Sequence, residues 1–111
     1  MAAVNTYADI VETVLEAFTK IPYAHGELTC EAIFDRQRSR FVLVTLGWDD
    51  DERVHHPLVH IDIVGDKLWL QTDNTEHGIA PELVEAGIPK SSIVLAFRPP
   101  EVRKHTEYAV A

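Results

Sequence analysis

Cysteine and positive charge are both scarce in this sequence, and each shortage excludes a class of protein. Cys30 is the single cysteine among 111 residues, so no internal disulfide can form. It stands in a run that reads Leu-Thr-Cys-Glu-Ala. A small apolar residue at such a place is typically buried, which favours a packing role over a catalytic thiol.

Basic residues are too few for a protein that binds DNA unaided. Ten Lys and Arg face eighteen Asp and Glu, for a formal net charge of -8. Such proteins gain most of their non-specific affinity by neutralising phosphates. The best local basic patch is Arg36, Arg38 and Arg40, and alternating charges in a short loop are typical of a solvated turn. We therefore expect no tight direct DNA binding, whereas the acidic excess favours solubility and a basic protein partner.

Long hydrophobic runs are also missing. No segment is long and apolar enough to span a membrane, and the first residues lack a basic start followed by an apolar signal run. The hydrophobic share of 46% fits a globular chain. These features predict one cytoplasmic domain over residues 1–111, without membrane contact.

The first twenty residues have the periodicity of a helix. Apolar residues recur at steps of three and four: Val4, Tyr7, Ala8, Val11, Val14, Leu15 and Phe18. This spacing predicts an amphipathic helix of about five turns. Asn5 or Thr6 is expected to cap its start, and Pro22 to end it.

Four strands are predicted next, over residues 27–35, 40–48, 58–64 and 67–71. The second is apolar on both sides, which suits a central strand covered on both faces. Gly65-Asp66 has the chemistry of a two-residue hairpin turn.

The last third of the chain predicts shorter elements. Residues 73–76 have turn chemistry, and a short helix over 81–86 is expected to begin at Pro81 and stop at Gly87. A fifth strand over 93–97 and a helical turn over 101–104 follow. This order predicts an α+β fold with a mainly antiparallel sheet of about five strands. The long N-terminal helix and the short helix of the C-terminal half would cover one face of the sheet.

His60 and Asp62 are the first candidates for chemistry. Residues two apart on a strand project from the same face. The two side chains could hold a metal if His55 or His56, which we expect in a loop beside Pro57, supplied another ligand. The alternative, which the weak spacing favours, is a polar strand face whose side chains bind neighbouring strands by hydrogen bonds.

An acidic run follows Trp48, over residues 49–52. Clustered carboxylates can bind calcium or magnesium, but the run lacks the glycine and the ligand spacing of an EF-hand. A solvated acidic turn is the favoured interpretation, and the turn could also dock basic groups.

Trp69 and Gln71 share one face of the strand over 67–71. Trp69 is either a binding hot spot or a sheet residue covered by a loop, and the sequence leaves both open. The candidate partner or ligand face then comprises Trp48, Asp49, His60, Asp62, Trp69, Gln71, Asp73 and Glu76.

No complete catalytic constellation can be assembled. A glycine-rich phosphate loop is missing. Asp62, Asp66 and Lys67 approach the pattern of a metal-dependent nuclease, but Asp66 and Lys67 are adjacent and point to opposite faces. The sequence therefore predicts a protein that is not an enzyme and that carries no cofactor.

Several segments, in order and with matching spacing, resemble the XisI family, the fdxN element excision controlling factors of cyanobacteria. The segments are Gly47-Trp48-Asp49, His60-Ile61-Asp62-Ile63, Lys67-Leu68-Trp69-Leu70-Gln71, Asp73-Asn74-Thr75-Glu76, Gly78-Ile79-Ala80, Gly87-Ile88-Pro89-Lys90, Ile93-Val94-Leu95-Ala96-Phe97, Pro100, Arg103 and Thr106-Glu107-Tyr108-Ala109. The sequence departs from the family at Asn74, where glycine is expected, and in the longer acidic run after Trp48.

The resemblance implies an accessory role in site-specific DNA excision during heterocyst differentiation. It implies two partners, a nuclease-like companion called XisH and a separate site-specific recombinase. We expect the chain to act by protein–protein interaction rather than catalysis. Two alternatives stay open: a small-molecule or metal-binding enzyme or sensor, and an antitoxin-like inhibitor of the companion. An exposed strand edge could also support a homodimer.

Overall fold

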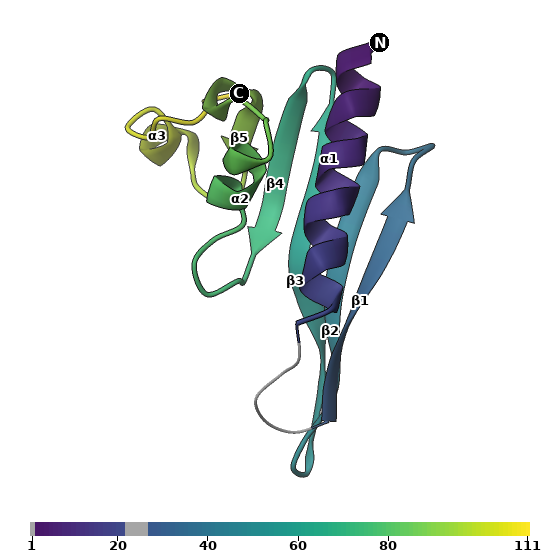
Figure 1. The fold of residues 1–111 in the computed structure, drawn as a ribbon. Coiled ribbons are helices and arrows are strands. Elements are labelled where there is room, and N and C mark those ends of the chain that lie inside the picture. The colour runs from purple at the N-terminus through teal and green to yellow at the C-terminus, as the bar shows by residue number, and fades with distance from the viewer. Residues whose placement is uncertain (1, 22–26) are drawn as a thin grey trace.

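The computed structural model describes residues 2–21 and 27–111, beginning with one long helix (Figure 1). Helix α1, Ala2–Thr19, buries Ala8, Val11 and Leu15 against the sheet. The predicted cap at Asn5 or Thr6 is wrong, because both positions lie inside the helix. Helix α1 ends before Pro22, which lies outside the described residues.

Five strands form one sheet in the order of the sequence. They are β1 Glu27–Asp35, β2 Arg40–Asp49, β3 Glu52–Val64, β4 Lys67–Asp73 and β5 Ile93–Leu95. The first four pair antiparallel, and β5 pairs parallel to β4. The α+β architecture and the mainly antiparallel sheet are confirmed. The hairpin turn between β3 and β4 is confirmed as well, with Gly65 at a φ of 64°.

Short helices complete the chain: α2 Ala80–Glu85, the 3-10 turn η1 Lys90–Ser92 and α3 Pro100–Arg103. Helix α1 lies across one face of the sheet (Figure 1). Buried residues of α1 and α2 join one hydrophobic core with that face, so the prediction that these two helices cover one face is confirmed. No helix in the described part of the chain is long and apolar enough to cross a membrane.

The core lies between the helices and one face of the sheet. Its centre is a row of directly opposed side chains, Phe41 on β2, Ile61 on β3 and Leu70 on β4, all fully buried. Complete burial of such a side chain contributes about 1.5–3 kcal/mol. We call this the covered face, and the opposite one the open face.

The second strand lies inside the sheet, between β1 and β3, as predicted, but the prediction that it is covered on both faces is wrong. Strand β2 is second from the edge, and its buried residues Phe41, Leu43 and Thr45 alternate with the half-buried Val42 and Val44. The apolar residues on both sides of β2 suggested that other elements pack against each face of this strand. Helices α1 and α2, however, pack only on the covered face.

The predicted loop around His55 and His56 is also wrong, because both residues lie in β3. The hairpin of β2 and β3 is longer than expected, and a bulge between Leu43 and Val44 shifts the register beside Pro57. Proline is tolerated in a strand at such a bulge, so Pro57 does not end the strand.

Candidate functional site

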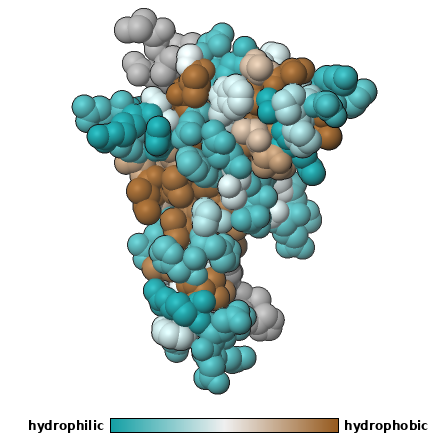
Figure 2. Space-filling model, turned by 180° about the vertical axis from the view of Figure 1, so that it is seen from behind, coloured by the Kyte–Doolittle hydropathy of each residue, from teal (hydrophilic) through white to brown (hydrophobic). Residues whose placement is uncertain are grey.

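The open face carries a strip of apolar side chains on its β1 and β2 side. Ile33 lies opposite Val42 in the register, and Val44 and Leu46 follow on β2. Ile33 is 58% exposed, while the three β2 residues are half-buried. Figure 2 shows hydrophobic residues gathered on this side of the molecule between hydrophilic ones. We call these four residues the apolar strip.

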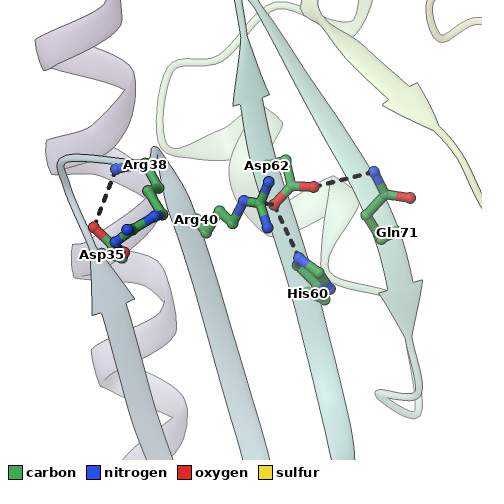
Figure 3. Close-up of polar contacts among 6 residues, drawn as sticks. All are labelled: Asp35, Arg38, Arg40, His60, Asp62 and Gln71. Carbon is green, nitrogen blue, oxygen red and sulfur yellow. Dashed lines mark hydrogen bonds and ion pairs between the residues drawn. The ribbon is translucent and has the colours of Figure 1, made fainter.

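Four polar side chains lie next to one another on the same face: Arg40 on β2, His60 and Asp62 on β3, and Gln71 on β4 (Figure 3). We call these four residues the polar group. His60 Nε2 lies 2.9 Å from Asp62 Oδ1, and Gln71 Nε2 donates to Asp62 Oδ2 at 3.2 Å. Arg40 Nε approaches Asp62 Oδ1 to 4.0 Å. The two-residue spacing correctly predicted that His60 and Asp62 share a face. The proximity of Arg40 to Asp62 follows only from the pairing of β2 with β3.

Hydrogen bonds and ion pairs within the polar group converge on Asp62. The carboxylate of Asp62 is 19% exposed, and each of its oxygens already has a polar neighbour. Within residues 2–21 and 27–111, no three His, Cys, Asp or Glu side chains come together to hold a metal ion. Asp62 thus accepts a hydrogen bond from Gln71 on the neighbouring strand, as the favoured alternative expected, whereas His60 contacts Asp62 within β3 itself.

Trp69 is covered by the C-terminal segment. The Arg103 guanidinium lies 5.6 Å from the centre of the indole ring. Arg103 also donates from Nε to the carbonyl of Arg98 at 2.9 Å and from Nη1 to that of Val110 at 2.6 Å. Of the two alternatives for Trp69, the structure therefore favours a covered sheet residue that anchors the tail.

Trp48 and Asp49 lie at the far end of the β2–β3 hairpin, away from His60. The Arg53 guanidinium lies 5.4 Å from the Trp48 ring, and the indole remains 46% exposed. Asp50 turns the chain with a φ of 55°. The acidic run is thus an exposed hairpin turn, and its residues do not join the polar group.

Asp73 holds the turn that follows β4. Its Oδ1 accepts from the Thr75 amide at 3.1 Å and from the Thr75 hydroxyl at 2.6 Å, and its Oδ2 accepts from the Ile79 amide at 2.7 Å. Glu76 lines a cleft of about 460 Å³ between α1, the turn and α2. The structure thus gives Asp73 a structural role and separates Glu76 from the open face.

The three arginines near the β1–β2 turn do not make a basic patch. Arg36 pairs with Glu12 and, at 2.7 Å, with Asp9 on α1. Arg38 pairs with Asp35 at 3.1 Å, and Arg40 faces Asp62. Each cation therefore has a carboxylate neighbour, which leaves little positive charge for a phosphate backbone.

Asp35 offers a pH-dependent test of this turn. The Arg38 amide donates to Asp35 Oδ1 at 3.0 Å, and the Arg38 guanidinium contacts Oδ2, so both lower the pKa of the Asp35 carboxyl. Because the folded pKa lies below the unfolded one, this contribution to stability is present above the unfolded pKa and is lost as the pH falls through the folded pKa.

We expect Arg38→Ala to raise the Asp35 pKa only part of the way to its ordinary value, because the backbone donor, the larger cause, remains. A carboxyl NMR titration measures this, with Lys104→Ala as a distant control of the same charge change. An unchanged Asp35 pKa in Arg38→Ala would contradict the assignment.

The fold and its site define a small α+β protein with one sheet face covered by helices and the other carrying an apolar strip beside a polar group. The family model described as XisI protein matches residues 1–110. The chain therefore belongs to the XisI family.

Two solved structures are similar over nearly their whole length. A XisI-like protein from Anabaena variabilis ATCC 29413 shares 30% identity with a TM-score of 0.87, covering 97% of this chain and 99% of the other. The fdxN element excision controlling factor XisI from the same strain shares 28% identity with a TM-score of 0.82, covering 98% and 99%. No curated protein sequence matches this chain.

Proposed function

We propose that this chain is an accessory factor in site-specific DNA excision of the fdxN element type, acting in the cytoplasm by binding protein rather than by catalysis. The chain belongs to the XisI family, and a structural neighbour named XisI is described as an fdxN element excision controlling factor. A controlling factor needs to reach the machinery that cuts and rejoins DNA. We infer that it does so through its partners, a XisH-like companion and a site-specific recombinase.

The observation that carries this proposal is the apolar strip on the open face. Contiguous exposed apolar surface with a polar rim typically marks an interaction site. Here Ile33 and its neighbours on β2 are flanked by His60, Asp62 and Arg40. Hydrophobic contact would supply affinity, and the polar group would fix the orientation of the partner.

The charge distribution supports a protein partner with basic groups. The net charge is -8, and the arginines of the β1–β2 turn face carboxylates within the chain. Long-range attraction to a basic partner speeds association, whereas a bare duplex would be repelled.

Val42→Lys tests the proposal, because it places a charge in the middle of the apolar strip. We expect the frequency of excision to fall at least about tenfold, because the lysine replaces apolar contact surface with a charge that loses its water when the partner docks. A cost of about 1.4 kcal/mol corresponds to this factor. The measurement is quantitative amplification of the excised junction in cells whose own copy of the gene is replaced by the variant.

Val102→Lys is the matched control, because Val102 is an exposed valine on α3. It should leave excision unchanged, and both variants should keep the melting temperature of the parent. In parallel, the purified XisH-like companion should co-elute with the parent chain but not with Val42→Lys. Full excision by a folded Val42→Lys variant, or a tight and salt-independent complex of the parent with bare DNA, would contradict the proposal.

A further inference from the structure

Strand β1 forms an edge of the sheet. Among the described residues it pairs with β2 alone, through nine consecutive pairs from Glu27 opposite Trp48 to Asp35 opposite Arg40. An edge strand presents a row of backbone N–H and C=O groups that a further strand can bind. The opposite edge is less open, because β5 spans three residues and Val94 bridges to Ala109.

The β1 edge lacks most of the devices that keep edges from pairing. Such devices include proline, bulges and charged side chains that point inward. No register shift interrupts β1 and β2, in contrast to the two bulges along β3. The inward-facing residues of β1 are all apolar and half-buried: Leu28, Cys30, Ala32 and Phe34.

The remaining protection is negative charge on the open face of β1. Glu27, Glu31 and Asp35 stand at every fourth residue and therefore share this face with Ile33. Asp35 is paired with Arg38. Within the described chain, Glu27 and Glu31 are exposed and form no ion pair.

This charge pattern discriminates between possible occupants of the edge. In an antiparallel pair of two copies with all nine residues matched, Glu31 would face itself and Glu27 would face Asp35. Like charges directly opposite one another on a sheet are destabilising, and two copies with a net charge of -8 also repel at long range. A strand with basic residues would instead form favourable pairs at the same positions.

We propose that the β1 edge binds an extended basic segment of a protein partner, which adds to the sheet as a sixth strand. This inference rests on the proposed function and names the chemistry of the partner. The segment carries Lys or Arg on the side that faces Glu27 and Glu31, with aliphatic residues between them. The aliphatic residues extend the core beside Ala32 and Phe34.

The proposed strand adjoins the apolar strip. Ile33 on β1 lies opposite Val42 on β2, so a partner that continues beyond its added strand would pass over the strip. Backbone hydrogen bonds would then supply binding at the edge, and side chains on alternate positions would supply specificity. One partner could occupy both surfaces.

A nine-residue peptide that alternates lysine and valine, with lysine at both ends, is the probe. We expect it to bind the full chain and to slow amide hydrogen exchange within β1. The same peptide with glutamate in place of lysine should not bind. Because only alternate amides of an added strand face the sheet, N-methylation of one alternate set of peptide amides should abolish binding, and methylation of the other set should leave it unchanged.

Glu31→Lys should weaken peptide binding about tenfold, since it converts a favourable cross-strand pair into a repulsive one. Glu85→Lys makes the same charge change at an exposed position of α2 and should leave the affinity nearly unchanged. Equal loss in the two variants, or equal tolerance of both N-methylated peptides, would show attraction to net charge alone and overturn the inference.

A second copy of the chain as the natural occupant would also overturn it. Sedimentation would then show a concentration-dependent dimer that Glu31→Lys alters. The excision assay separates this inference from the proposed function. Loss of excision in Val42→Lys without specific peptide binding keeps the accessory role and discards the added strand. Specific peptide binding together with full excision in Val42→Lys keeps the added strand and discards the accessory role.

Discussion

Replacing Ile61 by alanine should lower the free energy of unfolding by about 2–5 kcal/mol. Ile61 lies on the central strand β3, directly between Phe41 on β2 and Leu70 on β4, and none of the three side chains is exposed. The substitution removes buried methyl and methylene groups and leaves a cavity that three neighbouring strands cannot easily close. Urea denaturation followed by circular dichroism measures the change.

Ile33→Ala is the matched control for this prediction. It removes the same atoms from the open face, where the side chain is 58% exposed, so we expect a loss below about 1 kcal/mol. A small domain has roughly 5–15 kcal/mol of stability, so only the Ile61 variant should approach unfolding. Similar losses in the two variants would mean that the open face is buried in solution, for instance in an oligomer.

The sheet was predictable because its residues alternate. Residues 27–35 were predicted as a strand with the bounds that β1 has, and the glycine of the β3–β4 turn fixed that hairpin from local chemistry alone. Helix α1 followed from its three- and four-residue spacing. These features depend on neighbours in the sequence, which the sequence shows directly.

The features that depend on pairing between strands were not predictable. Which face of β2 is covered depends on where α1 and α2 pack, and its apolar residues on both sides hid the difference. The placement of His55 in β3 required the register of the long β2–β3 hairpin. The pattern could not separate Asp73, which holds a turn, from Asp62, which belongs to the polar group.

The proximity of some candidate residues was predictable, whereas that of others depended on strand pairing. His60, Asp62 and Gln71 share a strand face by their spacing and register, and the structure brings them together. Arg40 comes from a neighbouring strand, and the apolar strip combines residues from β1 and β2. A surface assembled across strands has no signature in a single segment, so the open face emerged only from the fold.

Gly47→Ala should destabilise the chain by about 3 kcal/mol and displace the first residues of β1. Gly47 has a φ of 138°, and a β-carbon built there would lie 2.0 Å from the Glu27 carbonyl oxygen. A backbone atom cannot swing aside as a flexible side chain does. The pair of Leu28 with Gly47 must therefore open, and the strand edge that carries Glu27 moves with it.

Gly65→Ala supplies the comparison, because Gly65 also has a positive φ, 64°, but nothing lies within 4 Å of its added β-carbon. Only the conformational cost of about 1–2 kcal/mol applies there. Thermal and urea denaturation should show a larger loss of stability for Gly47→Ala than for Gly65→Ala. The lysine–valine peptide should bind Gly65→Ala normally and Gly47→Ala weakly, because only the latter distorts β1. Normal peptide binding by a destabilised Gly47→Ala variant would place the binding surface elsewhere on the sheet.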